Sequence, residues 1–216
     1  SGIYGEMYNQ ITAGTLENTE AARNAFLRIA EYRNTDWFDL LFSNSLQHNH
    51  SISMSSGNEK SQYYASMRAM VDPGWAKQSN VSRYTANFNA NYNIFKQLSF
   101  NMISSASYRQ QRAPGTLSSD VDVVSGEVKR DFDINPYSYA LNTSRVLDPT
   151  AFYKRNYADF NILHELENNY MDFDVVDLKF QGEFKLKPFA GLELSALGAV
   201  KYSSTAQQHI ITDYSN

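Results

Sequence analysis

The sequence predicts an all-β protein built from about six long antiparallel strands. Apolar and polar residues alternate through stretches of ten or more residues, which is the pattern of a strand whose successive side chains point to opposite faces of a sheet. The composition favours strands as well, because 15 Tyr and 13 Phe accompany 20 Asn and 24 Ser, and helix-forming residues are correspondingly scarce. No run of about eighteen apolar residues is present, so the sequence predicts no transmembrane helix.

Charge and cysteine content exclude several classes of protein. A formal net charge of −4 argues against a nucleic-acid-binding surface. The absence of cysteine excludes a disulfide scaffold, thiol catalysis and a zinc site built from cysteines. The first residues show no basic segment followed by an apolar one, so no signal peptide is expected at this end of the sequence.

Residues 1–46 are expected to form a connecting segment with one short helix. Between residues 19 and 32, apolar side chains such as Ala22, Phe26 and Ile29 recur at a spacing of three to four residues, which is typical of a helix with one apolar face. Asn18 or Thr19 would supply the N-cap oxygen at its start.

Residues 47–109 predict about four strands, arranged as two hairpins. From Tyr84 to Ile94 every even position is apolar, and every odd position between them is Thr or Asn. After a break at residues 95–97 the alternation resumes through residues 98–108, and so short a link indicates an antiparallel hairpin. A weaker hairpin is predicted from residues 47–55 and 61–70.

A further hairpin is predicted at residues 175–203, around the turn Pro188-Phe189-Ala190-Gly191. Residues 110–174 are expected to form a long loop, which is uncommon in a compact domain unless the loop has a function. Residues 204–216 are expected to begin the next loop. The turns within hairpins are therefore short, and the connections between hairpins are long and rich in Tyr, Asn and Asp.

The apolar face of this sheet allows two interpretations. In a soluble β-sandwich it packs against a second sheet, whereas in a transmembrane barrel it contacts lipid and the polar face lines the lumen. The predicted strands are longer than the five to six residues usual in soluble sheets and match the length of a tilted membrane strand. Short turns at one rim and long loops at the other are typical of outer-membrane barrels. Soluble sandwiches are much the commoner class, so these observations leave the two interpretations evenly balanced.

Several short sequences resemble the SusC/RagA family of TonB-dependent outer-membrane transporters. They occur in order along residues 34–203, and their order and spacing carry more weight than any one of them. The sequences in the first half are NTDWFD (34–39), QHNHSISMSSGNEK (47–60), YYASM (63–67), DPG (72–74) and SRYT (82–85). Those in the second half are FNILHELENNY (160–170) and LKPFAGL (186–192).

The resemblance implies that the chain is an internal fragment of an antiparallel transmembrane barrel of about 22 strands. Residues 1–46, 110–174 and 204–216 would then lie on the extracellular side of a Gram-negative outer membrane, and the family's plug domain and TonB-contacting segment are absent. Members of the family import oligosaccharides, or in some cases oligopeptides, and a SusD-like surface lipoprotein acts as their lid. The resemblance implies glycan uptake as the commoner activity, with no catalysis and no cofactor.

On this interpretation the two faces of the sheet have different surroundings. The candidates for contact with lipid are Tyr84, Ala86, Phe88, Tyr92, Leu192, Leu194 and Val200. The candidates for the lumen are Arg68, Arg83, Thr85, Asn87, Asn89, Asn91 and Asn93, and we expect them to contact the plug and trapped water more than the substrate.

The long loop supplies the candidates for contact with a ligand or with the lid protein. Aromatic rings stack on the apolar faces of sugars, and nearby polar groups bind the hydroxyls. The candidates are Tyr137, Tyr139, Tyr153, Tyr157, Asp131 and Asp133. The pair His48 and His50 could present two imidazoles to a metal, but no carboxylate lies close in the sequence, and we assign no metal site.

Two other functions remain open at this point. A secreted or surface β-sandwich that binds glycans or mediates adhesion would share the alternating strands but fold without lipid. A simple diffusion porin would share the barrel but not the plug.

Overall fold

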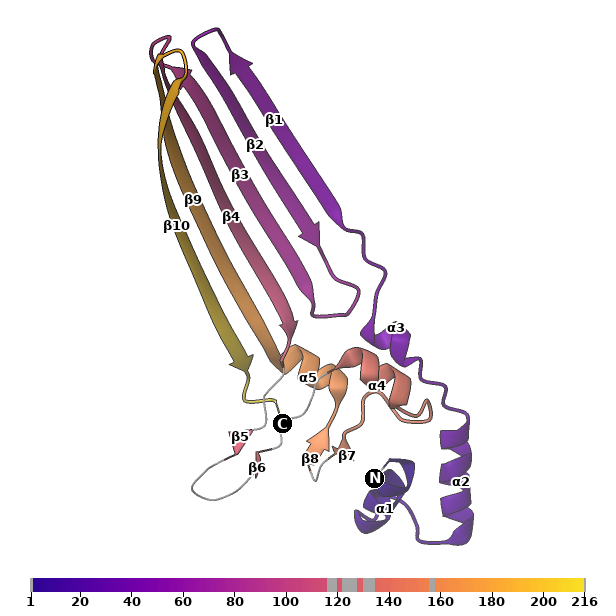
Figure 1. Ribbon diagram of the computed structural model, residues 1–216. Helices are drawn as coiled ribbons and strands as arrows, with labels where there is room; N and C mark the ends of the chain where they lie inside the picture. Colours follow the sequence, from indigo (N-terminus) through magenta and orange to yellow (C-terminus); the bar gives the residue numbers. More distant parts are fainter. Residues whose placement is uncertain (1, 116–119, 122–127, 130–134, 156–157, 216) are drawn as a thin grey trace.

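The computed structural model describes residues 2–115, 120–121, 128–129, 135–155 and 158–215. Its main element is a six-stranded antiparallel sheet in the order β1-β2-β3-β4-β9-β10, which confirms the all-β prediction. The strands extend side by side from tight turns at one end to a group of short helices at the other (Figure 1). Their bounds are β1 His48–Gly57, β2 Ser61–Asp72, β3 Asn80–Asn93, β4 Leu98–Pro114, β9 Asn169–Phe189 and β10 Leu192–Ile211.

The turns at the far end of the sheet follow from local sequence. The side chain of Asn58 accepts hydrogen bonds from the backbone N–H groups of Lys60 and Ser61, both at 2.9 Å, and so closes the link between β1 and β2. Gly191 closes the link between β9 and β10 with a positive φ of 94°, a conformation that glycine adopts at little cost. The outer edges of β1 and β10 have no strand partner among the described residues.

The last two strands are longer than the alternation predicts. β9 begins at Asn169 and β10 continues to Ile211, whereas the predicted hairpin covers residues 175–203. β4 likewise reaches Pro114, so the connection to β9 is shorter than the predicted loop 110–174. Residues 204–211, expected at the start of a loop, continue the ladder as far as the pair Ile211 and Asn169.

The predicted helix is present as α2 (Glu20–Glu31), with the hydroxyl of Thr19 accepting a hydrogen bond from the N–H of Ala22. Four more helices occur in the described residues. They are α1 (Ile3–Thr12), α3 (Trp37–Leu41), α4 (Pro136–Asn142) and α5 (Ile162–Asn168). The expectation of one short helix is therefore corrected to five helices among the described residues. Three of the four additional helices have seven residues or fewer, which is too short for a helical spacing of apolar residues to be recognised in the sequence.

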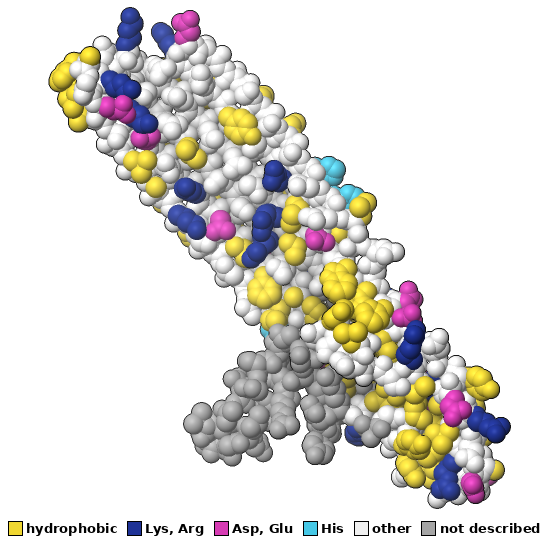
Figure 2. Space-filling view, turned by 45° about the vertical axis from the view of Figure 1, so that its right-hand side comes forward, with side chains coloured by type: hydrophobic (Ala, Val, Ile, Leu, Met, Phe, Trp, Pro, Cys, Tyr) yellow, Lys and Arg dark blue, Asp and Glu magenta, His cyan; other side chains and the backbone are white. Residues whose placement is uncertain are grey.

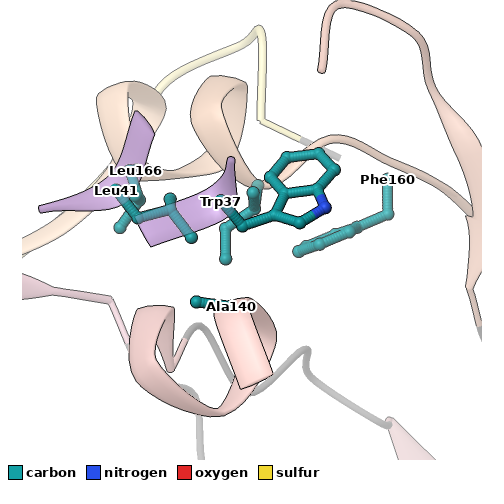
Figure 3. Close-up of a cluster of buried hydrophobic side chains, with 6 residues drawn as sticks. Trp37, Leu41, Ala140, Phe160 and Leu166 are labelled. Atoms are coloured by element: carbon teal, nitrogen blue, oxygen red, sulfur yellow. The ribbon is translucent and has the colours of Figure 1, made fainter. Parts of the chain in front are cut away.

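These short helices enclose the buried apolar core of the described residues. Trp37, Leu41, Ala140, Phe160 and Leu166 converge from α3, α4, β8 (Ala158–Phe160) and α5 (Figure 3). We call this part, with α1, α2 and β7 (Tyr153–Arg155), the loop module. It lies at one end of the sheet, near both chain termini (Figure 1).

Two smaller features complete the fold. β7 pairs with β8, and a second small ladder joins β5 (Asp120–Val121) to β6 (Val128–Lys129). No helix among the described residues is both long enough and apolar enough to cross a bilayer.

Candidate functional site

The six-stranded sheet has one apolar and one polar face, and the register assigns each residue to a face. Residues directly opposite each other on neighbouring strands lie on the same side. Phe88 of β3 is opposite Ala65 and Ser104, and the row continues through Phe180 to Val200. Large apolar side chains that are exposed on this face include Ile52, Met54, Met67, Phe88, Phe180, Phe184, Leu194 and Val200.

The predicted lipid-facing residues come together on this apolar face, with one exception. The register places Tyr84, Ala86, Phe88, Tyr92, Leu194 and Val200 there. Leu192 is opposite Phe189, beyond a register shift between Leu192 and Leu194, so the same ladder does not assign its face.

The described residues place no second layer over the apolar face. The strands of the sheet contact mainly one another, and the helices lie beyond one end of the sheet (Figure 1). A shallow hollow of about 590 Å³ lies on this face, where Ala69, Ala86 and Ala106 leave space between larger side chains. The apolar face is therefore an exposed surface six strands wide.

The apolar face ends towards the loop module in a polar border. Ser82, Gln110 and Asp174 form the next row, and the hydroxyl of Tyr108 donates a 2.8 Å hydrogen bond to Asp174. One row further, the guanidinium of Arg112 makes two hydrogen bonds to the carboxylate of Asp172, at 2.7 and 2.8 Å. The change from apolar to charged rows occurs within four residues along β4.

The predicted lumen-facing residues share the opposite, polar face. Arg68, Arg83, Thr85, Asn87, Asn89, Asn91 and Asn93 all fall on it by register. Asn87 donates a 3.2 Å hydrogen bond to the hydroxyl of Ser66 on β2, and Asn93 donates one to the carbonyl of Glu59. Dark blue Lys and Arg side chains gather midway along this sheet in Figure 2.

The loop module is fastened by contacts between segments that are far apart in sequence. The indole N–H of Trp37 donates a 3.0 Å hydrogen bond to the carbonyl of Ser144, and the hydroxyl of Thr35 donates one of 2.7 Å to the carbonyl of Leu147. Asn161 caps α5 with its side-chain oxygen, and its amide group donates to the carbonyls of Pro149 and Ala151. Residues 34–42, 135–155 and 158–168 therefore form one unit.

A network of polar groups joins α1 to this unit. The hydroxyl of Tyr153 donates a 2.9 Å hydrogen bond to Glu6 and accepts one of 2.8 Å from the N–H of Asp148. Burial and the hydrogen bond to Glu6 raise the pKa of Tyr153 to about 12. Hydrogen bonds from Thr150, together with the nearby Arg33, lower the pKa of Asp148. A guanidinium nitrogen of Arg33 also lies 3.4 Å from a carboxylate oxygen of Glu6.

Four aromatic side chains form an exposed patch at the junction of the loop module and the sheet. Phe42 stacks on Trp75 with ring centroids 4.5 Å apart, and Phe38 stacks on Phe42 at 5.6 Å. Tyr137 meets Trp75 edge-on at 6.0 Å. Phe38, Trp75 and Tyr137 are between 41% and 57% exposed, so much of the aromatic patch is accessible to solvent.

A polar pocket of about 470 Å³ lies within the loop module. Tyr139, Tyr153 and Phe160 line it together with the side chains of Asn135, Asn142 and Lys154. Aromatic rings, amides and one ammonium group can together bind an uncharged polar molecule or the backbone of a peptide. Tyr139 also packs edge-on against Trp37 at 5.2 Å.

The structure separates the predicted loop candidates. Tyr137 belongs to the aromatic patch, whereas Tyr139 and Tyr153 line the polar pocket. Tyr157, Asp131 and Asp133 lie outside the described residues. The two imidazoles of His48 and His50 lie with ring centroids 6.1 Å apart on β1, and the described residues contain no group of three potential metal ligands.

Sequence reasoning missed Phe38, Phe42 and Trp75 as members of one surface. Phe42 and Trp75 belong to separate segments, which an isolated bridge between Phe42 and Ala76 brings together. The available signal was the presence of Trp75 directly after the turn Asp72-Pro73-Gly74, because a large aromatic in an exposed turn points to a contact surface.

Comparison with known proteins shows which fold this is. No protein-family model matches the sequence, and no curated protein matches it significantly. Among solved structures, a chain of the RagAB peptide transporter matches with a TM-score of 0.66 and 18% identity over 95% of this chain. Chains of the RagAB peptide importer in its "closed-closed" and "open-open" states match with a TM-score of 0.64 over 82% of this chain, at 18% and 19% identity.

These matches establish the architecture of the chain. The chain has the fold of a segment of such a transporter, and the described residues do not close the sheet into a barrel. It spans about a quarter of the length of the first matched chain, 24%, and 20% and 19% of the other two.

Proposed function

We propose that the chain forms part of the barrel wall of a TonB-dependent outer-membrane importer that works with a SusD-like surface lipoprotein. The cargo is an oligomer, either an oligopeptide or an oligosaccharide. The proposal includes no catalytic step and no cofactor. It rests above all on one observation, the exposed apolar face of a six-stranded sheet whose other face is polar.

The dimensions of the apolar face support contact with a bilayer. On β4 it runs from Leu98 to Tyr108 before the polar border begins, which is about 33 Å along the strand at roughly 3.3 Å per residue. A strand tilted by about 40° would carry this length across about 25 Å, the height of the apolar band of an outer-membrane barrel.

The unpaired edges of β1 and β10 support the same proposal. A sheet edge exposes backbone N–H and C=O groups, which lipid cannot hydrogen-bond. In a closed barrel, further strands would pair with both edges. This chain covers 24% of the first matched transporter chain, so the rest of such a chain is long enough to supply those strands.

The loop module supports an extracellular partner. In the proposed orientation it lies outside the membrane, on the side of the polar border formed by Arg112 and Asp172. The aromatic patch there is exposed, and aromatic side chains are enriched at the centres of protein interfaces. We propose it as a contact for the lid lipoprotein.

The cargo is better supported as a peptide than as a glycan. The matched structures are described as a peptide transporter and a peptide importer, and the family habit of glycan uptake is the weaker guide. The polar pocket, with its amides and Lys154, would suit a peptide backbone.

A soluble β-sandwich with adhesive or glycan-binding function is the second candidate. It would need a second layer over the apolar face, and the described residues supply none. We therefore rank it below the importer.

Single cysteines introduced on the two faces test the proposal, since these 216 residues contribute no thiol of their own. In the full-length protein in cells, Phe88→Cys should react with a lipid-soluble maleimide but not with a charged, membrane-impermeant one. Asn89→Cys, its neighbour on the polar face, should show no preference for the lipid-soluble reagent. Recovery of the full-length protein in the soluble fraction, or equal labelling of Phe88→Cys by the two reagents, would overturn the proposal.

A further inference from the structure

We propose that a cluster of basic side chains on the polar face binds acidic oligopeptides through their side-chain carboxylates. This basic cluster consists of Arg68, Arg83, Arg109, Lys179 and Lys201. The inference rests on the proposed function, and it specifies the cargo as a peptide that carries negative charge. It assigns Arg68 and Arg83 to the cargo, in place of the contacts with the plug and trapped water that the sequence led us to expect.

The register brings the five basic residues into three consecutive rows. Arg83 of β3 lies directly opposite Arg109 of β4, and Lys179 of β9 lies directly opposite Lys201 of β10. Arg68 lies opposite Thr85, one row from Arg83 on the neighbouring strand. Side chains opposite each other in a sheet are about 5 Å apart, and diagonal neighbours about 7–8 Å, so Arg68, Arg83 and Arg109 form one group. Lys179 and Lys201 form a second group on the same face, because the row that contains Asp177 lies between Lys179 and the row of Arg109.

Like charges placed directly opposite each other destabilise a sheet, yet this surface contains two such pairs. The described residues provide no ion pair to any of the five basic groups, although seven ion pairs form elsewhere among them. The Nε atom of Arg109 is buried, and the described residues supply no hydrogen-bond acceptor for it. A buried donor without an acceptor is costly, so nothing among the described residues compensates the charge of this arginine.

The acidic residues nearest to the basic cluster have other partners. Asp177 lies between the two pairs and accepts a 2.6 Å hydrogen bond from the hydroxyl of Ser203. Asp72 lies at the edge of the cluster and accepts a 2.9 Å hydrogen bond from the N–H of Gly74. Five positive and two negative charges leave the surface with a net charge of +3, on a sequence whose overall net charge is −4.

The other residues in these three rows favour a peptide over a sugar. None of them is aromatic, so the surface has no ring on which a sugar could stack. They are mostly short hydroxyl and amide side chains, such as Ser51, Thr85, Asn87 and Ser105, which can hydrogen-bond a peptide backbone. Figure 2 shows the basic side chains in dark blue, with little magenta among them.

Binding of two matched peptides to the full-length transporter in detergent micelles tests the inference. One peptide has eight residues that alternate Glu and Gly, and the other replaces each Glu by Gln. We expect the Glu peptide to bind at least about tenfold more tightly at low salt, because each charge-assisted hydrogen bond contributes about a factor of ten or more. Added salt should reduce this difference.

A double variant shows whether the basic cluster is responsible. Arg83→Gln combined with Arg109→Gln should lower the affinity for the Glu peptide by about tenfold or more and leave that for the Gln peptide unchanged. Lys60→Gln combined with Lys96→Gln removes the same charge from exposed turns at the far end of the sheet and should change neither. Equal binding of the two peptides to the wild type, or an equal loss in both double variants, would overturn the inference.

Two further outcomes would also count against it. Tighter binding of an oligogalacturonate than of the Glu peptide would assign the surface to acidic sugars. Loss of both peptides in the arginine variant, together with increased proteolysis of the transporter, would assign the arginines to contacts within the protein. If the cysteine labelling succeeds while the two peptides bind equally, the importer stands and this inference alone fails.

Discussion

Phe88 and Asn89, adjacent residues of β3, lie on opposite faces of the sheet and in different surroundings. Phe88 is opposite Ala65 and Ser104 on the apolar face, whereas Asn89 is opposite Tyr64 and Ile103 on the polar face. Successive side chains of a strand point to opposite faces of the sheet. One step along the chain therefore leads from the surface proposed to contact lipid to the surface proposed to line the lumen.

Charged substitutions at these two positions should therefore differ in cost. Phe88→Arg places a guanidinium on the lipid side of the strand, which costs about 2–4 kcal/mol near the middle of a bilayer. Asn89→Arg keeps the charge on the hydrated side and should be mild. Reversible unfolding of the full-length barrel in lipid vesicles measures both, and equal destabilisation would contradict the assignment of the faces.

The core of the loop module provides a second prediction. Trp37 is 3% exposed and packs with Leu41, Phe160 and Leu166, while its indole N–H is bonded to Ser144. Trp37→Ala should destabilise this part by about 3–5 kcal/mol, as expected when a large buried side chain is removed. Limited proteolysis of the full-length protein should then cut within residues 34–42 or 135–168 at a much higher rate.

The adjacent residue is the matched control for this change. Phe38 is exposed and contributes its ring to the aromatic patch, so Phe38→Ala should cost no more than about 1.5 kcal/mol. It should instead weaken the proposed contact with the lid lipoprotein. Proteolysis that rises equally in both variants would show that Trp37 does not hold the module together.

The sequence predicted the sheet well because strand faces are a local property. Alternation from Tyr84 to Ile94 is enough to assign both faces of β3, and the short link that follows it fixes the pairing with β4. The end of β10 could not be predicted in the same way. Residues 203–208 contain no large apolar side chain, and their strand conformation comes from the ladder with β9.

The loop module and the aromatic patch depended on contacts that sequence does not display. The five-residue helix α3 is too short to be stable alone, and the bond from Trp37 to Ser144 joins residues 107 positions apart. The basic residues were predicted only in part. Arg68 and Arg83 were predicted to face the lumen, but only the register places Arg109 opposite Arg83 and puts Lys179 and Lys201 on the same face.

The turn between β2 and β3 provides a third prediction. Gly74 has a φ of 71°, and a Cβ atom there would lie 2.2 Å from the carbonyl oxygen of Ser79. Gly74→Ala should therefore combine the strain of a left-handed conformation, about 1–2 kcal/mol, with a clash against backbone. We expect a lower yield of assembled full-length barrel, measured by the heat-dependent shift of its mobility on a denaturing gel.

Gly14 separates these two effects. It has a similar φ of 73°, but no atom lies within 4 Å of the position of its Cβ. Gly14→Ala should thus carry the conformational strain without the clash and leave assembly nearly intact. A yield as low for Gly14→Ala as for Gly74→Ala would show that the clash with Ser79 is unimportant.

The raised pKa of Tyr153 provides the last prediction, on the response of the loop module to alkaline pH. The pKa of about 12 in the folded protein exceeds the ordinary value of 10.0, so folding favours the protonated phenol that donates to Glu6. The stability contributed by this shift is fully present below pH 10.0, and it falls as the pH rises from there towards about 12. Proteolysis within residues 135–168 of the full-length protein should accelerate over that interval, measured with a protease whose own activity is constant across it.

The Tyr153→Phe variant cannot ionise at this position and should lack that acceleration, whereas Tyr137→Phe, which alters a phenol in the exposed aromatic patch, should retain it. The same rise in the Tyr153→Phe variant would show that another group controls the alkaline response.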